Sequence, residues 1–335
     1  MRKRLLLALA SALPLGACAA PAFVYGPYKH APLAFDAASQ ALRSAAGDGN
    51  AQPLPRMLPV GAGTVSWAFA LGECGSERWG EGIDTARFAT ANVQAFVQAG
   101  IDYIVSTGGE GGLFTCGSDE GMERFIARYD SPRLVGIDLD IESTQTDDGI
   151  AALVQRVKAA QARHPRLRFS FTLPTFASSD GSQRSLNGLG ERVLRAIRQH
   201  GLADYRINLM VMDYGEASAA ACVVDQGRCD MARSALQAAH NLQAKHGVPP
   251  AQIELTAMIG VNDVVSNVFT IDDARRLAAE VRRQGLGGLH FWSLDRDTPC
   301  SEPQAGASAT CSGVAAPPLS FSRVFAQPLR RQPAP

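Results

Sequence analysis

The stretch VGIDLDIE, at Val135–Glu142, alternates apolar and acidic side chains and decides the fold class of this 335-residue chain. Successive side chains of a β-strand point to opposite faces, so Asp138, Asp140 and Glu142 share one face and the aliphatic side chains share the other. An exposed, solvated acidic face is the alternative. Parallel strands are normally covered on both faces, however, which favours a row of enclosed carboxyl groups.

Strands and helices alternate on both sides of this stretch, a pattern that predicts right-handed crossovers and a parallel sheet. Roughly 240 residues show it, the usual span of a (β/α)8 barrel. We therefore predict an α/β fold with one (β/α)8 TIM barrel, a doubly wound open sheet being the alternative. A short, irregular strand near Arg78–Gly82 would be the eighth. The other expected strands are Thr64–Ala70, Asp102–Thr107, Arg133–Glu142, Arg168–Pro174, Tyr205–Asp213, Gln252–Ile259 and Leu286–Asp295, and the expected helices are Thr85–Gln98, Gly121–Tyr129, Asp148–Arg163, Gly188–His200, Met231–His246 and Ile271–Gln284.

The acidic row has the chemistry of an acid–base site. Enclosed carboxyl groups about 7 Å apart titrate as a coupled set with at least one raised pKa, and a carboxyl still protonated near neutral pH can act as a general acid. Glu142 ends the row, at the carboxyl end of its strand, where barrel enzymes hold their catalytic groups. Chelation of Mg²⁺ or Ca²⁺ in a metal-dependent hydrolase or phosphodiesterase is the alternative. No further acidic or histidine cluster completes such a shell, so we expect no metal and no cofactor.

The amino terminus predicts export. Residues 1–18 combine Arg2, Lys3 and Arg4 with an apolar run and the ending Leu-Gly-Ala-Cys, which resembles a bacterial lipobox. Cys18 would then be lipidated, and the protein would be exported from a bacterial cell and anchored at the periplasmic or surface face of a membrane, or secreted. An ordinary cleavage site is the alternative. The chain has 32 basic and 32 acidic residues, which argues against nucleic-acid binding.

Proline-rich segments set the expected domain limits. We predict an Ala/Pro-rich tether at residues 19–60, with one short helix near Ala37–Ser44, a single catalytic barrel at residues 61–298, and a Pro-rich tail at residues 299–335. Within the tail, Leu319–Phe325 is expected to pack on the barrel. No segment suggests an obligate partner chain, and we expect a monomer.

Six cysteines remain after Cys18, an even number that in an exported chain suggests disulfides. Six cysteines allow 15 connectivities. The short spacings favour two local pairs, which leaves a third pair over. Zinc ligation is the alternative, and no CxxC pair supports it. The favoured pairs are Cys222 with Cys229, Cys300 with Cys311, and Cys74 with Cys116.

The acidic strand resembles the DxxDxDxE pattern of strand 4 in the family 18 glycoside hydrolases, the chitinase family. Asp138, Asp140 and Glu142 match its last three acids, Gly136 matches the glycine usual after the first, and Val135 stands where the first acid is expected. The resemblance implies a TIM barrel and retaining hydrolysis of β-1,4 bonds next to N-acetylglucosamine, with the substrate's acetamido oxygen as nucleophile. Glu142 would be the acid/base, Asp140 would hold the acetamido N–H, and Asp138 would share a proton with Asp140.

Three further motifs follow in the order of the family. Ser106-Thr107-Gly108-Gly109 resembles its SxGG, whose glycines would let the backbone approach the substrate. Met212 and Tyr214 resemble its MxYD, with Gly215 in place of the last acid, so that Tyr214 would hold the acetamido group and Asp213 could supply a sugar contact. Trp292 resembles the tryptophan beneath the sugar. The stretches Met258–Asp263 and Phe291–Asp297 look closest to small bacterial chitinases.

These observations predict a glycosidase acting on chitin or another N-acetylglucosamine glycan, with soluble or accessible chains favoured over crystalline chitin. A non-catalytic, lectin-like protein on the same barrel is the alternative, and a metal-dependent phosphodiesterase is a lesser one.

Overall fold

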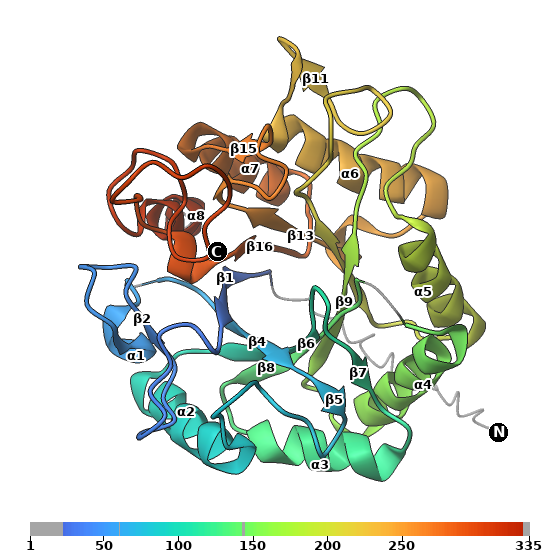
Figure 1. The fold of residues 1–335 in the computed structure, drawn as a ribbon. Coiled ribbons are helices and arrows are strands. Elements are labelled where there is room, and N and C mark those ends of the chain that lie inside the picture. The colour runs from blue at the N-terminus through green and yellow to red at the C-terminus, as the bar shows by residue number, and fades with distance from the viewer. Residues whose placement is uncertain (1–22, 60, 143–144, 331–335) are drawn as a thin grey trace, which may run out of the picture.

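Eight parallel strands close into a barrel that a ring of helices surrounds (Figure 1). The structure is a computed structural model and describes residues 23–59, 61–142 and 145–330; the predicted signal sequence and Cys18 lie outside these ranges. Within them, no helix is both long enough and apolar enough to span a membrane. The predicted TIM barrel is confirmed. Its strands are β1 (Val24–His30), β4 (Val65–Ala70), β6 (Tyr103–Gly108), β8 (Leu134–Asp140), β9 (Arg168–Pro174), β10 (Arg206–Met210), β13 (Ile253–Met258) and β16 (Gly288–Trp292).

The helices lie in the crossovers, and most begin at a side-chain cap. Asp84, Ser118 and Thr146, for example, each accept a hydrogen bond from the backbone three residues on, which satisfies an otherwise free N–H group. The long helices are α2 (Thr85–Ala99), α3 (Asp119–Tyr129), α4 (Asp147–Arg163), α5 (Gly188–Gln199), α6 (Met231–His246), α7 (Ile271–Arg283) and α8 (Ser320–Arg330), and α1 (Leu54–Met57) is one turn long.

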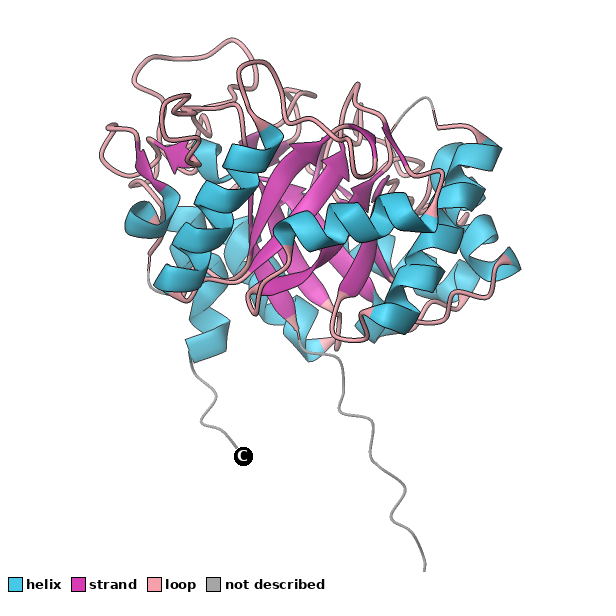
Figure 2. Ribbon diagram, turned by 90° about the horizontal axis from the view of Figure 1, so that it is seen from below, coloured by secondary structure: helices cyan, strands magenta, loops and turns pink. Residues whose placement is uncertain are grey.

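The connections between barrel strands and helices also contain pairs of short strands and 3₁₀ turns. Long loops gather at one end of the barrel (Figure 2). The pairs are β2 (Arg43–Ser44) with β3 (Gln52–Pro53), β5 (Gly72–Glu73) with β7 (Phe114–Thr115), β11 (Val224–Asp225) with β12 (Arg228–Cys229), and β14 (Gly260–Val261) with β15 (Val268–Phe269), and the 3₁₀ turns are η1 (Pro250–Gln252) and η2 (Leu294–Arg296).

The amino-terminal part of the barrel corrects the sequence prediction. Strand β1 lies inside the predicted tether and pairs with both β4 and β16, so it is the eighth strand. The predicted strand at Arg78–Gly82 is wrong, because that segment makes only an isolated bridge, from Leu71 to Arg78. The predicted helix at Ala37–Ser44 is also wrong: that segment consists of turns and includes strand β2. Strand β1 lacks the hydrophobic pattern of a buried strand because it contains polar residues whose partners are distant in the sequence. Lys29, for example, forms a buried ion pair with Asp295 at 2.8 Å.

The carboxyl-terminal segment also belongs to the barrel rather than to a separate tail. The predicted packing of Leu319–Phe325 is confirmed, since Phe321 and Phe325 are buried. Phe325 stacks on Phe291 of β16 with ring centroids 5.2 Å apart. Helix α8 therefore completes the ring of helices, and the barrel extends beyond the predicted limits of 61–298.

The three favoured disulfides are confirmed. Cys74 bonds to Cys116 across 42 residues, Cys222 to Cys229 across 7, and Cys300 to Cys311 across 11. The first joins the β4–α2 connection to the segment before α3 and closes the longest loop of the three. A disulfide stabilises mainly by restricting the unfolded chain, more so for longer loops.

Loss of the longest cross-link should therefore cost the most stability. The double variant Cys74→Ser/Cys116→Ser is expected to lower the free energy of unfolding by about 4 kcal/mol, and Cys222→Ser/Cys229→Ser by about 2.5 kcal/mol. Urea unfolding followed by circular dichroism measures both. An equal loss, or the reverse order, would contradict the loop-length argument.

Candidate active site

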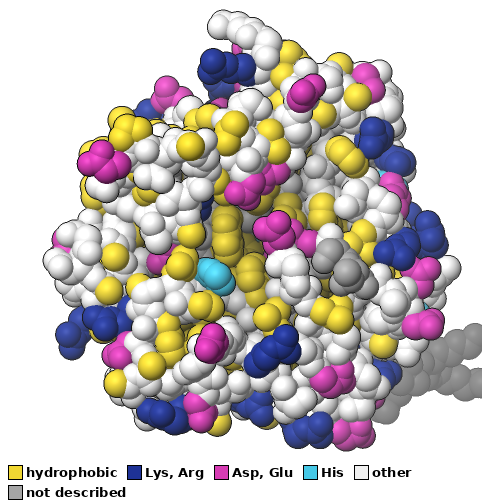
Figure 3. Space-filling model, in the orientation of Figure 1, with side chains coloured by type: hydrophobic (Ala, Val, Ile, Leu, Met, Phe, Trp, Pro, Cys, Tyr) yellow, Lys and Arg dark blue, Asp and Glu magenta, His cyan; other side chains and the backbone are white. Residues whose placement is uncertain are grey.

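A cavity of about 570 Å³ opens at the carboxyl ends of the strands. It is the hollow near the centre of the face seen in Figure 3, where hydrophobic and acidic side chains meet. This end of a barrel is where such folds hold their chemistry. The lining residues are Tyr28, Phe69, Glu110, Asp140, Glu142, Thr172, Pro174, Thr175, Phe176, Asn187, Met210, Met212, Asp213, Thr256, Met258, Asp263, Val264 and Trp292.

The acidic row follows the predicted alternation. Asp138 and Asp140 point into the barrel, while Ile137 and Leu139 are buried in the apolar core outside it. Strand β8 ends at Asp140, so Glu142 stands two residues beyond it, half-buried in the cavity wall. The carboxyl groups of Asp140 and Glu142 therefore line the cavity, and that of Asp138 lies beneath them.

Asp138 forms the centre of a buried polar network. It lies behind the cavity wall and accepts hydrogen bonds from four hydroxyl groups. The donors are Ser170 Oγ at 2.6 Å, Ser106 Oγ and Thr172 Oγ1 at 2.7 Å each, and Tyr28 OH at 2.9 Å. Both oxygens of Asp138 are therefore occupied by protein donors, which makes them poorly available to a metal ion.

A second layer holds these donors in place. The amide of Asn208 donates to Tyr28 OH at 3.0 Å and to Thr172 Oγ1 at 2.8 Å, and it accepts from Thr256 at 2.9 Å. The network spans β1, β6, β8, β9, β10 and β13. Such a fully satisfied network fixes the positions of its members.

Asp140 lies between this network and the cavity. Burial raises the pKa of its carboxyl well above the usual range, and the charges of Glu142 and Asp138 raise it further. Its carboxyl also interacts with that of Glu142 through a side-chain hydrogen bond. Its Oδ1 is buried without a partner among the described residues. That oxygen is free to bond a ligand in the cavity.

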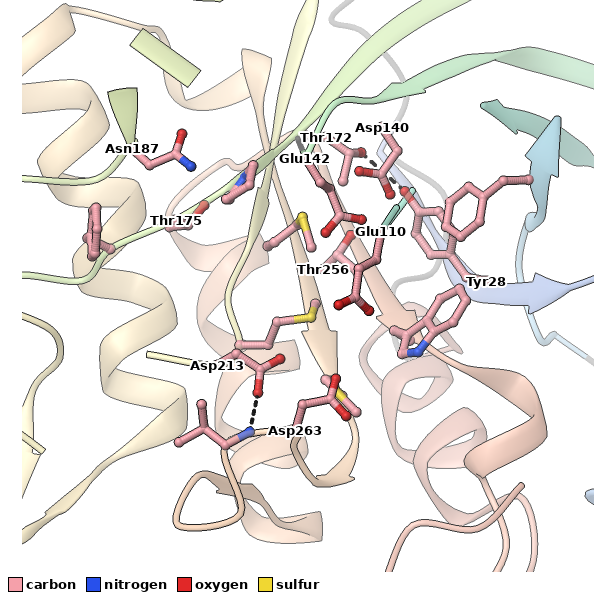
Figure 4. Close-up of a pocket in the computed structure, with 18 residues that line it drawn as sticks. Tyr28, Glu110, Asp140, Glu142, Thr172, Thr175, Asn187, Asp213, Thr256 and Asp263 are labelled. Carbon is pink, nitrogen blue, oxygen red and sulfur yellow. Dashed lines mark hydrogen bonds between the residues drawn. The ribbon is translucent and has the colours of Figure 1, made fainter. Parts of the chain in front are cut away.

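Burial raises the pKa of Glu142 to about 7, and the charges of Glu110 and Asp213 contribute further, while the hydrogen bond with Asp140 opposes the shift. In Figure 4, the carboxyl groups of Glu142 and Glu110 point into the same space. A carboxyl group that retains its proton near neutral pH can protonate a leaving group.

An aromatic floor lies beside the carboxyl groups. Trp292 lines the cavity and stacks on Phe69, with ring centroids 5.5 Å apart, and its ring centroid is 6.2 Å from that of Tyr28. Flat apolar faces of this kind suit the faces of sugar rings. The structure thus places Trp292 in the lining of the same cavity as Asp140 and Glu142.

The motif that follows strand β10 contributes part of its predicted residues to the cavity lining. Met210 and Met212 line the cavity, as does Asp213, which turns inward at a positive φ of 50°. Asp213 accepts a hydrogen bond from the Val264 backbone at 2.8 Å. Tyr214 does not line the cavity; it is buried, and its hydroxyl has no partner among the described residues. Asp213 is therefore the carboxyl group that this motif places in the cavity lining.

Gly108 and Gly109 lie outside the cavity lining. A Cβ on Gly108 would meet the Asp140 carbonyl oxygen at 2.1 Å, and one on Gly109 would meet the Phe69 ring at 2.7 Å. The structure therefore requires glycine at both positions for close packing beside the site.

The lining residues that sequence reasoning missed include Tyr28, Phe69, Glu110 and Asp263. Glu110 directly follows the Gly108-Gly109 turn, which could have marked it. Tyr28 and Phe69 carry no sequence signal, because they lie on strands whose inward faces have no distinctive pattern.

The group that could share a metal ion among the described residues is Glu73 with Cys74 and Cys116, and both of these sulfurs are in the disulfide. It lies outside the cavity lining. The carboxyl groups of the cavity do not form such a group in the described part of the chain.

Carboxyl groups with raised pKa values beside aromatic side chains, at the carboxyl end of a TIM barrel, are an arrangement that suits the acid–base chemistry of glycoside hydrolysis. Comparison with known proteins agrees. The chain is 28% identical over 272 residues to the probable bifunctional chitinase/lysozyme of Escherichia coli, covering 74% of this chain and 29% of that protein. It is 28% identical over 235 residues to Endochitinase 11 of Metarhizium anisopliae, covering 63% of this chain and 43% of that one. No protein-family model matches.

The fold is similar to the catalytic domain of the hyperthermophilic chitinase from Pyrococcus furiosus, with a TM-score of 0.69 and 25% identity over 92% of this chain and 96% of that domain. The resemblance to the family 18 chitinases is thereby confirmed in sequence and in fold. The chain spans less than half the length of the two curated relatives above.

Proposed function

We propose that the chain is a retaining glycosidase that cleaves β-1,4 bonds of chitin or another N-acetylglucosamine glycan. One observation carries the proposal: Glu142, with a pKa of about 7, stands in the same cavity as Asp140, whose buried Oδ1 is unpaired. The first can give a proton to a leaving oxygen, and the second can hold the N–H of an acetamido group. Chitinase catalytic domains share the fold.

The reaction would proceed in two steps. In the first, Glu142 protonates the glycosidic oxygen, that bond breaks, and the substrate's acetamido oxygen bonds to the anomeric carbon. Asp140 accepts a hydrogen bond from the acetamido N–H and stabilises the resulting positive oxazolinium ion. In the second, the Glu142 carboxylate takes a proton from water, whose oxygen bonds to the anomeric carbon as the bond from that carbon to the acetamido oxygen breaks. This step restores the acetamido group and releases the sugar with its configuration retained. Trp292 would support the sugar ring, and Asp213 would bond one of its hydroxyls.

The direct test is incubation of the purified protein with a fluorogenic N-acetylglucosamine oligomer, with and without a chelator. We expect the fluorophore to be released at the same rate in both. Binding without release would contradict the proposal and favour the lectin-like alternative. Loss of release in the chelator would favour a metal-dependent hydrolase.

The pH profile should report Glu142. We expect kcat/KM to fall as pH rises through about 7, because Glu142 then loses the proton that it must donate. Glu110→Gln removes a neighbouring negative charge, which lowers the pKa of Glu142 and moves this limb to lower pH. Initial rates from pH 4 to 9 on a neutral oligomer measure the shift. A limb that stays in place or moves to higher pH would contradict the account.

Tyr28 should act through Asp138. Tyr28→Phe removes one of four hydrogen bonds to that carboxylate, so we expect kcat/KM to fall about fivefold, the equivalent of one hydrogen bond. Thermal unfolding serves as the control for a general loss of structure. An unchanged kcat/KM in a folded variant would exclude this positioning role.

We further propose that the protein is exported, is anchored through a lipid on Cys18, and is a monomer. The residues Leu-Gly-Ala-Cys before and at Cys18 support the anchor. Cys18→Ala should shift the protein from the membrane pellet to the soluble fraction, where gel filtration reports its mass. An unchanged membrane fraction would contradict the lipid anchor.

A further inference from the structure

The cavity carries more negative charge than the proposed reaction uses. Its lining includes five carboxyl side chains and, among the described residues, no Lys or Arg. Asp140 and Glu142 serve the reaction, which leaves three others. These are Glu110, Asp213 and Asp263.

Glu110 forms one acidic position. It follows the glycine turn after β6, is exposed to solvent, and makes no hydrogen bond or ion pair with the rest of the described chain. Its charge is close enough to Glu142 to raise the pKa of that carboxyl. A cation bound here would offset the repulsion between the two groups.

Asp213 and Asp263 form a second acidic position, and Figure 4 shows them together on another part of the cavity wall. Asp213 is held by the Val264 backbone, whereas the side chain of the exposed Asp263 has no bonding partner among the described residues. Arg296 is buried behind them and donates to the carbonyl oxygens of Ile259 and Val261. It offsets part of their charge without occupying the cavity.

The proposed position of the acetamido group, beside Asp140, is distinct from these two acidic positions. Asp140 is about nine-tenths buried, and its unpaired Oδ1 belongs to the same cavity wall. An acetamido N–H satisfies that oxygen, as the proposed function requires. The two acidic positions are left for neighbouring sugars of the same chain.

We propose that the cavity prefers partially deacetylated chitin to fully acetylated chitin: an acetamido sugar beside Asp140, and protonated amino sugars beside Glu110 and Asp263. This inference rests on the proposed function and names its substrate class. The amino group of glucosamine is a cation in mildly acidic solution, and carboxylates in a cleft attract such a chain and pair with it. Each ammonium–carboxylate pair at such a site changes affinity by about two- to fivefold.

The test compares kcat/KM for two soluble substrates, a fully acetylated oligomer and a half-deacetylated chitosan, in mildly acidic buffer. We expect the wild-type ratio to favour the chitosan at about 20 mM salt and to fall severalfold at about 500 mM, where charges are screened. The double variant Glu110→Gln/Asp263→Asn should lower the low-salt ratio about fivefold or more and lose most of its salt dependence. Both substrates need the same acid, so a changed pKa of Glu142 cancels in the ratio.

A matched control keeps the comparison specific. Glu216→Gln/Asp225→Asn makes the same chemical change at two exposed positions outside the cavity lining and should leave the ratio as in wild type. A wild-type ratio that favours the acetylated oligomer at all salt concentrations, or one that the cavity variant leaves unchanged, would overturn this inference and leave the proposed function standing. Cleavage of neither substrate would overturn both.

Discussion

Glu142→Gln is expected to lower kcat/KM on a soluble N-acetylglucosamine oligomer by about 10²- to 10⁴-fold, the contribution typical of a general acid. Gln has nearly the same shape but no transferable carboxyl proton, so oligomer binding should persist while bond cleavage stops. The effect should be largest on substrates with poor leaving groups, which depend most on protonation. Steady-state kinetics and oligomer binding by calorimetry measure the two properties separately.

Glu216→Gln provides the control for that variant, because it removes an exposed carboxyl outside the cavity lining and should leave kcat/KM unchanged. A Glu142→Gln protein that binds the oligomer and still cleaves it within tenfold of the wild-type rate would rule out Glu142 as the acid.

Asp140→Asn should cause the second largest loss, about 10²- to 10³-fold in kcat/KM, which is the cost of removing one preorganised electrostatic contact. Asn keeps the size of the side chain. It cannot ionise as the positive charge of the oxazolinium ion develops beside it, and it gives up the carboxyl that bonds with Glu142. The loss should appear in kcat more than in KM, because the charge develops during reaction.

The matched control is Asp225→Asn, an exposed aspartate on β11, which should behave as wild type. Equal losses in the two variants would indicate a general effect of the substitution. Full activity of Asp140→Asn would remove Asp140 from the mechanism.

The barrel could be predicted because the hydrophobic pattern of most strands begins and ends within a few residues of the observed strand limits. Strand β9 was predicted to the residue, and β8 differs from its predicted limits only at the ends. Alternation along β8 then placed Asp138 and Asp140 inside the barrel, since the period of a strand leaves only two choices of face.

Strand β1 could not be predicted because long-range contacts stabilise it. Its Tyr28 bonds to Asp138, 110 residues away, and its Lys29 pairs with Asp295, 266 residues away. Gly26 interrupts the strand pattern, and the structure needs glycine there because a Cβ would lie 2.1 Å from the carbonyl oxygen of Thr64, the residue before strand β4. Local sequence carries none of this information.

The site beyond β8 was predicted only in part, because loop geometry decides which side chains reach the cavity. The positive φ of Asp213 turns its carboxyl inward and leaves the next residue, Tyr214, buried outside the lining. The resemblance from which the role of Tyr214 was predicted carries no information about this turn. The acidic positions at Glu110 and Asp263 likewise depend on the conformations of the loops that contain these residues.

The most direct test of the central claim is the anomeric form of the first product, followed by proton NMR as the wild-type protein cleaves a β-linked N-acetylglucosamine oligomer. Double-step catalysis with the acetamido group as nucleophile predicts that the β-anomer forms first and the α-anomer appears only by later mutarotation. Initial formation of the α-anomer would contradict the retaining mechanism, and no cleavage at all would contradict the proposed activity.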